Sequence, residues 1–113
     1  MLAAEADRRG PTIINGLEQL ASSGKKDPDQ VEKLRVEAHG LKGAALVVGQ
    51  ERLADLGRLM EEFLADAVKT GRINPSSAAP IIAAASAFNE GAHAAAEGVG
   101  EPSSVGDSLS ALG

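Results

Sequence analysis

Apolar residues recur at helical spacing in four stretches of the chain. Most of them lie three or four residues apart, which places each set on one face of a helix. Asp27-Pro28 is typical of an N-cap and first helical residue and predicts that the second helix runs from Pro28 to about Val48. Because the links are short, we expect an all-α, antiparallel up-down-up-down four-helix bundle. The four apolar sets are Ile13, Ile14, Leu17, Leu20 and Ala21; Leu34, Ala38, Leu41, Ala45 and Val48; Leu53, Leu56, Met60, Phe63, Leu64 and Ala67; and Ile81, Ala85, Phe88, Ala92 and Ala95.

Turn-forming residues set the expected limits of this bundle. Gly10-Pro11 interrupts the chain early, so residues 1–10 are expected to be an N-terminal arm or a short separate helix. Residues 11–98 are expected to form the bundle itself. Residues 99–113 are rich in turn formers and polar side chains, and we expect them to be a flexible C-terminal tail.

Composition supports helices and excludes several classes of function. The chain has 21 alanines and only 2% aromatic residues, which disfavours a β-sandwich or barrel. The absence of cysteine excludes disulfides, zinc-cysteine sites and thiol chemistry. A net charge of -5 argues against nucleic-acid binding, and no apolar stretch is long enough to cross a bilayer. The N-terminal residues do not resemble a signal peptide, so a cytoplasmic location is expected.

The polar face of the second predicted helix is unusual. Two glycines lie in it, although each costs an exposed helix about 1 kcal/mol relative to alanine. Apolar side chains also lie on this face, as in a patch that binds another protein. The face carries Val36, His39, Gly40, Gly43, Leu46 and Val47, and it is flanked by Arg35 and Lys42.

The spacing around His39 predicts a nucleophile that accepts an anionic group. Gly43, one turn later, provides no side chain to shield the imidazole. Lys42, three residues later, places an ammonium group within reach of anything attached to the ring. A neutral imidazole nitrogen can attack, and the neighbouring cation can balance the arriving negative charge.

The run AHGLKGAA from Ala38 to Ala45 resembles the histidine-containing phosphotransfer (Hpt) domain family. The family signature is H-x-x-K-G with a second glycine about ten residues after the histidine, and Gly49 matches that glycine. The resemblance continues through Leu53, Leu56 and Glu61-Glu62. It implies a four-helix bundle whose histidine takes a phosphoryl group from a receiver aspartate or a kinase and passes it to another receiver aspartate.

The resemblance also implies roles for individual residues. His39 corresponds to the phosphoacceptor, Lys42 to the cation near the phosphoryl oxygens, and Gly43 to the residue that gives access to the imidazole. The implied partners are response-regulator receivers and a hybrid histidine kinase, with Mg²⁺ held by the receiver and no metal or cofactor on this chain, which is expected to be a monomer. Gly40 and Ala44 depart from the family, because many members have hydroxyl residues there. The expected partner-binding residues are Arg35, Val36, Gly40, Leu46, Val47 and Gly49.

Several alternatives remain open. The chain is predicted to be a phosphoryl carrier. The alternative is a non-catalytic helical adaptor that binds a receiver or kinase through the same face, and a third possibility is one module of a longer kinase. The sequence contains no glycine-rich loop of the kind that binds phosphate groups, so it predicts no nucleotide-binding site on this chain. Val36, Leu46 and Val47 would instead belong to the core if residues 2–9 covered them. Two further features, His93 and the pair Glu61-Glu62, are interpreted as solvated surface.

Overall fold

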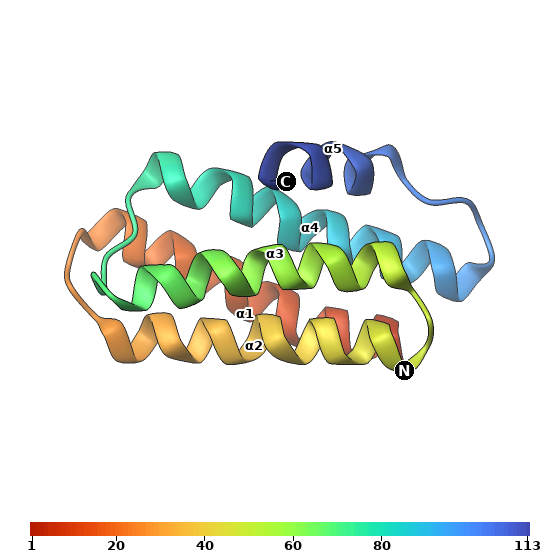
Figure 1. Ribbon diagram of the computed structural model, residues 1–113, viewed down its shortest axis with the longest axis horizontal. Helices are drawn as coiled ribbons and strands as arrows, with labels where there is room; N and C mark the ends of the chain where they lie inside the picture. The colour runs from red at the N-terminus through yellow and green to blue at the C-terminus, as the bar shows by residue number, and fades with distance from the viewer.

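The structure is a computed structural model that describes residues 1–113 and contains five helices and no strand. Four long helices form the predicted antiparallel up-down-up-down bundle, in which α1 and α3 each pack against both α2 and α4 (Figure 1). The molecule measures 42 × 22 × 20 Å. The helices are α1 (Leu2–Ser23), α2 (Pro28–Val47), α3 (Glu51–Val68), α4 (Pro75–Glu97) and α5 (Ser103–Leu112).

The start and end of α2, which carries the candidate site, follow from local chemistry. The Asp27 side chain accepts a hydrogen bond of 3.1 Å from the Gln30 amide, and Pro28 occupies the first turn, as the sequence predicts. The turn into α3 contains Gly49 with φ +73°, a left-handed conformation that side chains with a Cβ rarely adopt. The helix therefore has fixed ends, and α3 returns directly alongside it.

The predicted apolar faces form one continuous core. Its largest fully buried side chains include Ile13, Leu34, Leu56 and Phe88, one from each long helix. Val48, expected on the core face of the second helix, is instead 51% exposed. Because α2 ends at Val47, the Val48 side chain no longer follows the helical register.

The expected break at Gly10-Pro11 is wrong, because α1 continues through it. Leu2, Ala6, Gly10 and Ile13 are all buried and extend the apolar face of α1 at spacings of three and four residues. The exposed Pro11 removes one backbone hydrogen bond, at a cost of roughly 3 kcal/mol in a helix interior. Packing of this longer face offsets that cost.

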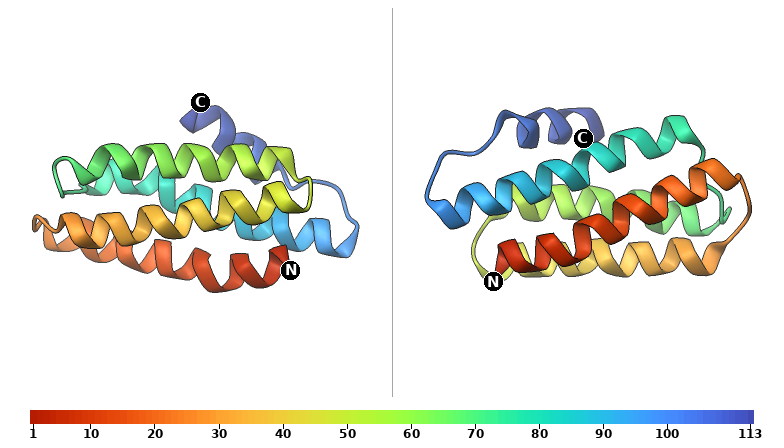
Figure 2. Two further views of the ribbon diagram at one scale, coloured as in Figure 1. Left: turned by 60° about the horizontal axis from the view of Figure 1, so that its bottom comes forward. Right: turned by 180° about the vertical axis from the view of Figure 1, so that it is seen from behind.

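The expected flexible tail is also wrong for residues 103–112, which form α5. This helix lies across α3 and α4 (Figure 2), with Val105 fully buried and Leu109 and Leu112 packed against the core. Gly91 of α4 makes room for it, because a Cβ there would lie 3.0 Å from Val105 Cγ2. Val105, Leu109 and Leu112 are spaced as one helical face, a signal that the surrounding glycines and serines obscure.

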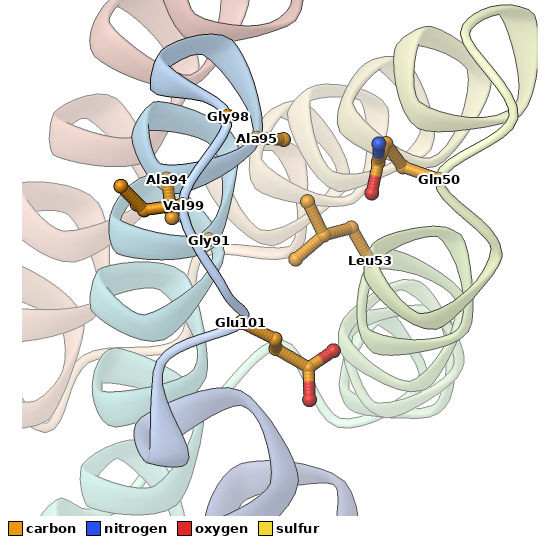
Figure 3. Close-up of a pocket in the computed structure, with 8 residues that line it drawn as sticks. All are labelled: Gln50, Leu53, Gly91, Ala94, Ala95, Gly98, Val99 and Glu101. Carbon is orange, nitrogen blue, oxygen red and sulfur yellow. The ribbon is translucent and has the colours of Figure 1, made fainter.

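The connection between α4 and α5 borders a cavity of about 280 Å³. Leu53 points from α3 toward α4 inside it, and Gln50 and Glu101 lie on opposite sides (Figure 3). Glu101 accepts a hydrogen bond of 2.8 Å from Arg52 Nε, so its charge is already paired. None of the candidate site residues lines this cavity.

Candidate functional site

His39 lies on the exposed side of α2, and 61% of its side-chain surface is accessible. Gly43 leaves open space beside it, because a Cβ at this position would meet no atom within 4 Å. Val36, Leu46 and Val47 are also exposed, so the alternative in which residues 2–9 cover them is wrong. The structure therefore brings together an accessible imidazole, an open approach and an apolar surface.

Glu61 of α3 connects the polar residues of this site. Its Oε2 lies 2.9 Å from His39 Nδ1 and 3.1 Å from Arg35 Nη1, and its Oε1 lies 2.8 Å from Lys42 Nζ. Only 15% of the Glu61 side chain is exposed, so its interpretation as a solvated residue is wrong. Glu62 is exposed and bonds Arg58, in agreement with the prediction for that residue.

Gly57 allows Glu61 to reach α2. A Cβ on Gly57 would lie 3.0 Å from both the Cα and the backbone nitrogen of Lys42, which is tighter than most Cβ contacts in proteins. Glu61 follows Gly57 by one turn on the same side of α3. The missing side chain at Gly57 therefore sets the helix separation at which one carboxylate bonds both His39 and Lys42. Sequence reasoning missed this residue, although a mid-helix glycine on an apolar face was a signal of close helix packing.

The charge of Glu61 fixes the hydrogen on the His39 ring. Partial burial raises the pKa of Glu61, but the hydrogen bonds and charges of Lys42 and His39 together outweigh it, so its pKa lies below the ordinary value. The carboxylate is ionised at neutral pH and can only accept hydrogen bonds. Nδ1 of His39 therefore carries the hydrogen, and in the neutral ring Nε2 keeps a free lone pair.

The sequence model of the Hpt domain family matches residues 3–97. The chain belongs to the Hpt domain family. No curated protein matches it significantly. The matched region runs from α1 to the end of α4, so α5 lies outside it. Hpt domains act in histidine phosphotransfer within phosphorelays, and they interact with receiver domains and histidine kinases.

Packing against Arg9 explains the glycine at position 40 of this Hpt domain. A side chain at Gly40 would overlap the guanidinium group of Arg9, which reaches across from α1. Arg9 Nη1 donates a 3.0 Å hydrogen bond to Glu37 Oε1, and Arg9 Nε bonds Glu5. The glycine thus accommodates an ion-pair network between α1 and α2, and its role in partner binding stays a prediction.

Two further features are absent from the Hpt domain. No group of three or more histidine, aspartate or glutamate side chains is arranged to bind a metal ion. None of the helices combines the length and the apolar character that crossing a membrane requires.

His93, the second histidine of the Hpt domain, links α4 to α1. Its Nε2 lies 2.7 Å from Asp7 Oδ1, and Asn89 donates a 2.8 Å hydrogen bond to the same oxygen. The hydrogen bond and charge of Asp7 raise the pKa of His93, with a smaller contribution from Glu97. Reciprocally, the hydrogen bonds from His93 and Asn89 lower the pKa of Asp7. His93 is a surface histidine, as the sequence predicts, with 41% of its side chain exposed, and it is paired with Asp7.

This pair predicts a pH-dependent contribution to stability. The His93 contribution is complete below the unfolded pKa of about 6.5 and disappears as pH rises through the higher folded value. The Asp7 contribution is complete above the unfolded pKa of about 3.9 and is lost as pH falls through the lower folded value. We expect Asp7→Asn to lower the free energy of unfolding, measured with urea, more at about pH 5.5 than at about pH 9. An equal loss at both pH values would contradict the prediction.

Proposed function

We propose that this Hpt domain carries phosphoryl groups between proteins on Nε2 of His39. The bond from His39 Nδ1 to Glu61 is the observation that carries the proposal. It orients the ring and leaves the lone pair on the nitrogen that is not engaged by Glu61. The open space at Gly43 gives a large partner access to that nitrogen.

The proposed step is an in-line transfer from a receiver aspartyl phosphate. The Nε2 lone pair forms a bond to phosphorus while the bond between phosphorus and the aspartate oxygen breaks, and that electron pair stays on the receiver carboxylate. Nε2 has no proton to lose, so the imidazole ring becomes positively charged. Glu61 stabilises this charge through the hydrogen bond from Nδ1, as the carboxylate of a catalytic triad stabilises an imidazolium. The same charge favours the reverse step, in which the phosphoryl group passes to another receiver.

The exposed residues around His39 are the proposed docking surface for both donor and acceptor, so only one partner binds at a time. Arg35, Gly40 and Gly49 border this surface, and its apolar part consists of Val36, Leu46 and Val47. We assign Mg²⁺ to the receiver, since this chain offers no carboxylate cluster for it. The proposed partners are receivers and a hybrid histidine kinase, and the proposed carrier is a cytoplasmic monomer without kinase activity.

Lys42 is proposed to balance the negative charge of the transferring group. Its ammonium group contacts the same Glu61 carboxylate as His39 Nδ1, so it lies near the His39 ring. We expect Lys42→Ala to slow transfer roughly 10- to 100-fold in single-turnover measurements while the circular dichroism stays unchanged. Lys33→Ala, which removes an exposed lysine of the same helix, is the matched control. An unchanged rate in Lys42→Ala would remove this residue from the mechanism.

A labelling experiment tests the proposal directly. The protein is incubated with radiolabelled phosphorylated receivers, and the label is expected to move to it in an acid-labile, base-stable form, as phosphohistidine requires. Absence of label with several candidate receivers would contradict the proposed function.

The second candidate function is a non-catalytic adaptor, which the exposed apolar surface would also serve. Titration of the unphosphorylated protein with a receiver separates the two functions. Binding without any transfer of label would favour the adaptor.

A further inference from the structure

The polar contacts of Glu61 are divided unequally between its two oxygens. Oε1 forms an ion pair with Lys42 alone, at 2.8 Å, whereas Oε2 is hydrogen-bonded to both His39 and Arg35. Loss of Lys42 would leave Oε1 without a donor but would leave both bonds to Oε2 in place.

The proposed function gives Lys42 a reason to leave Glu61. A phosphoryl group brings about two negative charges and three strong acceptor oxygens to Nε2. These oxygens compete with Glu61 for the ammonium group, which lies next to the reacting ring. At that moment Glu61 is still required against Nδ1, because the ring becomes positively charged as the bond to phosphorus forms. A partly buried carboxylate with fewer donors is more easily protonated or displaced.

We propose that Arg35 is a positioning residue that holds the Glu61 carboxylate against His39 Nδ1 while Lys42 turns to the phosphoryl group. Arg35 is placed for this role by a second carboxylate. Its Nε and Nη2 donate hydrogen bonds of 2.7 Å each to the two oxygens of Glu32, which leaves Nη1 directed at Glu61 at 3.1 Å. This inference rests on the proposed function and adds a role that His39 and Lys42 do not explain.

The geometry requires arginine and not merely a positive charge. A guanidinium group is planar and carries donors on several edges, so it can bond Glu32 and Glu61 together. A lysine ammonium on the same helix position is a single point that cannot reproduce the paired bond to Glu32 and the bond to Glu61 at once. We therefore expect Arg35→Lys to restore only part of what Arg35→Gln removes.

The first experiment is independent of phosphorylation and reads the His39 ring directly. Nitrogen chemical shifts of the imidazole report which ring nitrogen carries the hydrogen. Lys42→Ala imitates the departure of the ammonium group, and we expect this variant to keep the hydrogen on Nδ1. In Lys42→Ala combined with Arg35→Gln, a substantial part of the population is expected to move the hydrogen to Nε2. An unchanged ring in the double variant would overturn the proposal.

The second experiment measures phosphorylation with two donors. Phosphoramidate is small and needs no docking, whereas a phosphorylated receiver does. We expect Arg35→Gln to slow labelling of His39 about tenfold with both donors, and to have no further effect in a Glu61→Gln background. Arg58→Gln is the matched control, because it removes an α3 arginine that bonds Glu62 instead.

The outcomes distinguish a failure of the proposed role of Arg35 from a failure of the proposed function. Slowing with the receiver alone would make Arg35 a docking residue and overturn the positioning role. Equal effects of Arg35→Gln with and without Glu61 would also overturn it, since the residue would then act independently of the carboxylate. If the wild-type protein takes no label from either donor, the proposed function is contradicted. If the wild-type protein is labelled normally and the Arg35→Gln variant is labelled at the same rate, only the proposed role of Arg35 is contradicted.

Discussion

The His39→Gln variant is expected to accept no phosphoryl label from any receiver. Glutamine keeps the approximate size of the side chain and an N–H group that can donate to Glu61, but its amide nitrogen has no available lone pair for attack on phosphorus. Because most of the His39 side chain is exposed, the free energy of unfolding should change by less than about 0.5 kcal/mol. The measurement pairs receiver-to-protein label transfer with urea unfolding of the same preparation.

His93→Gln is the matched control for this variant. It removes the only other histidine and the contact to Asp7, so it should retain full labelling despite its effect on stability. Label that persists in His39→Gln and disappears in His93→Gln would move the phosphoryl site to α4 and contradict the assignment of His39.

Gly43→Leu is expected to change stability and partner binding in opposite directions. A Cβ at Gly43 meets open space, so leucine should stabilise the isolated protein by about 1 kcal/mol through its higher helix propensity. The same side chain projects where a receiver would approach His39. A misfit of about 1–3 kcal/mol in a close-packed interface corresponds to a Kd roughly 5- to 150-fold higher. Isothermal titration with a receiver and thermal unfolding of the free protein measure the two effects.

Two further variants test whether the loss of receiver binding depends on a large side chain at position 43. Gly43→Ala should give at least as large a gain in stability, because alanine has the highest helix propensity, with a smaller loss of affinity. Ala83→Leu adds the same side chain to an exposed position of α4, a helix that does not pack against α2, and it should leave receiver binding unchanged. Loss of helicity in Gly43→Leu would instead show that this glycine is required for packing.

Features that lie within one helix were predictable from the sequence. The cap at Asp27, the glycine turn after α2 and the exposed face around His39 all depend on residues a few positions apart, so helical spacing alone relates them. The same holds for the place of Lys42 beside His39. The antiparallel order of the four long helices also followed, because short connections leave few other arrangements.

Features that depend on contact between helices were not predictable in this way. Glu61 lies 22 residues after His39, and its role requires the close approach of α3 to α2 that Gly57 permits. Residues 1–10 and 103–112 were misjudged for a related reason. Gly10-Pro11 and the polar composition near the C-terminus describe local preference, whereas burial of Leu2 and Val105 against other helices decides that both segments are helical.

The sequence by itself determined the helical architecture and the position of His39 on an exposed face, because periodicity and local spacing are sufficient for both. Only the tertiary structure decided which nitrogen of that histidine is free and which residues hold the ring. Glu61 of α3 bonds one ring nitrogen and leaves the other free, and it reaches the ring only because α2 and α3 pack closely. The distance between two packed helices is set by side-chain volume at their contact and not by the spacing of residues along either helix.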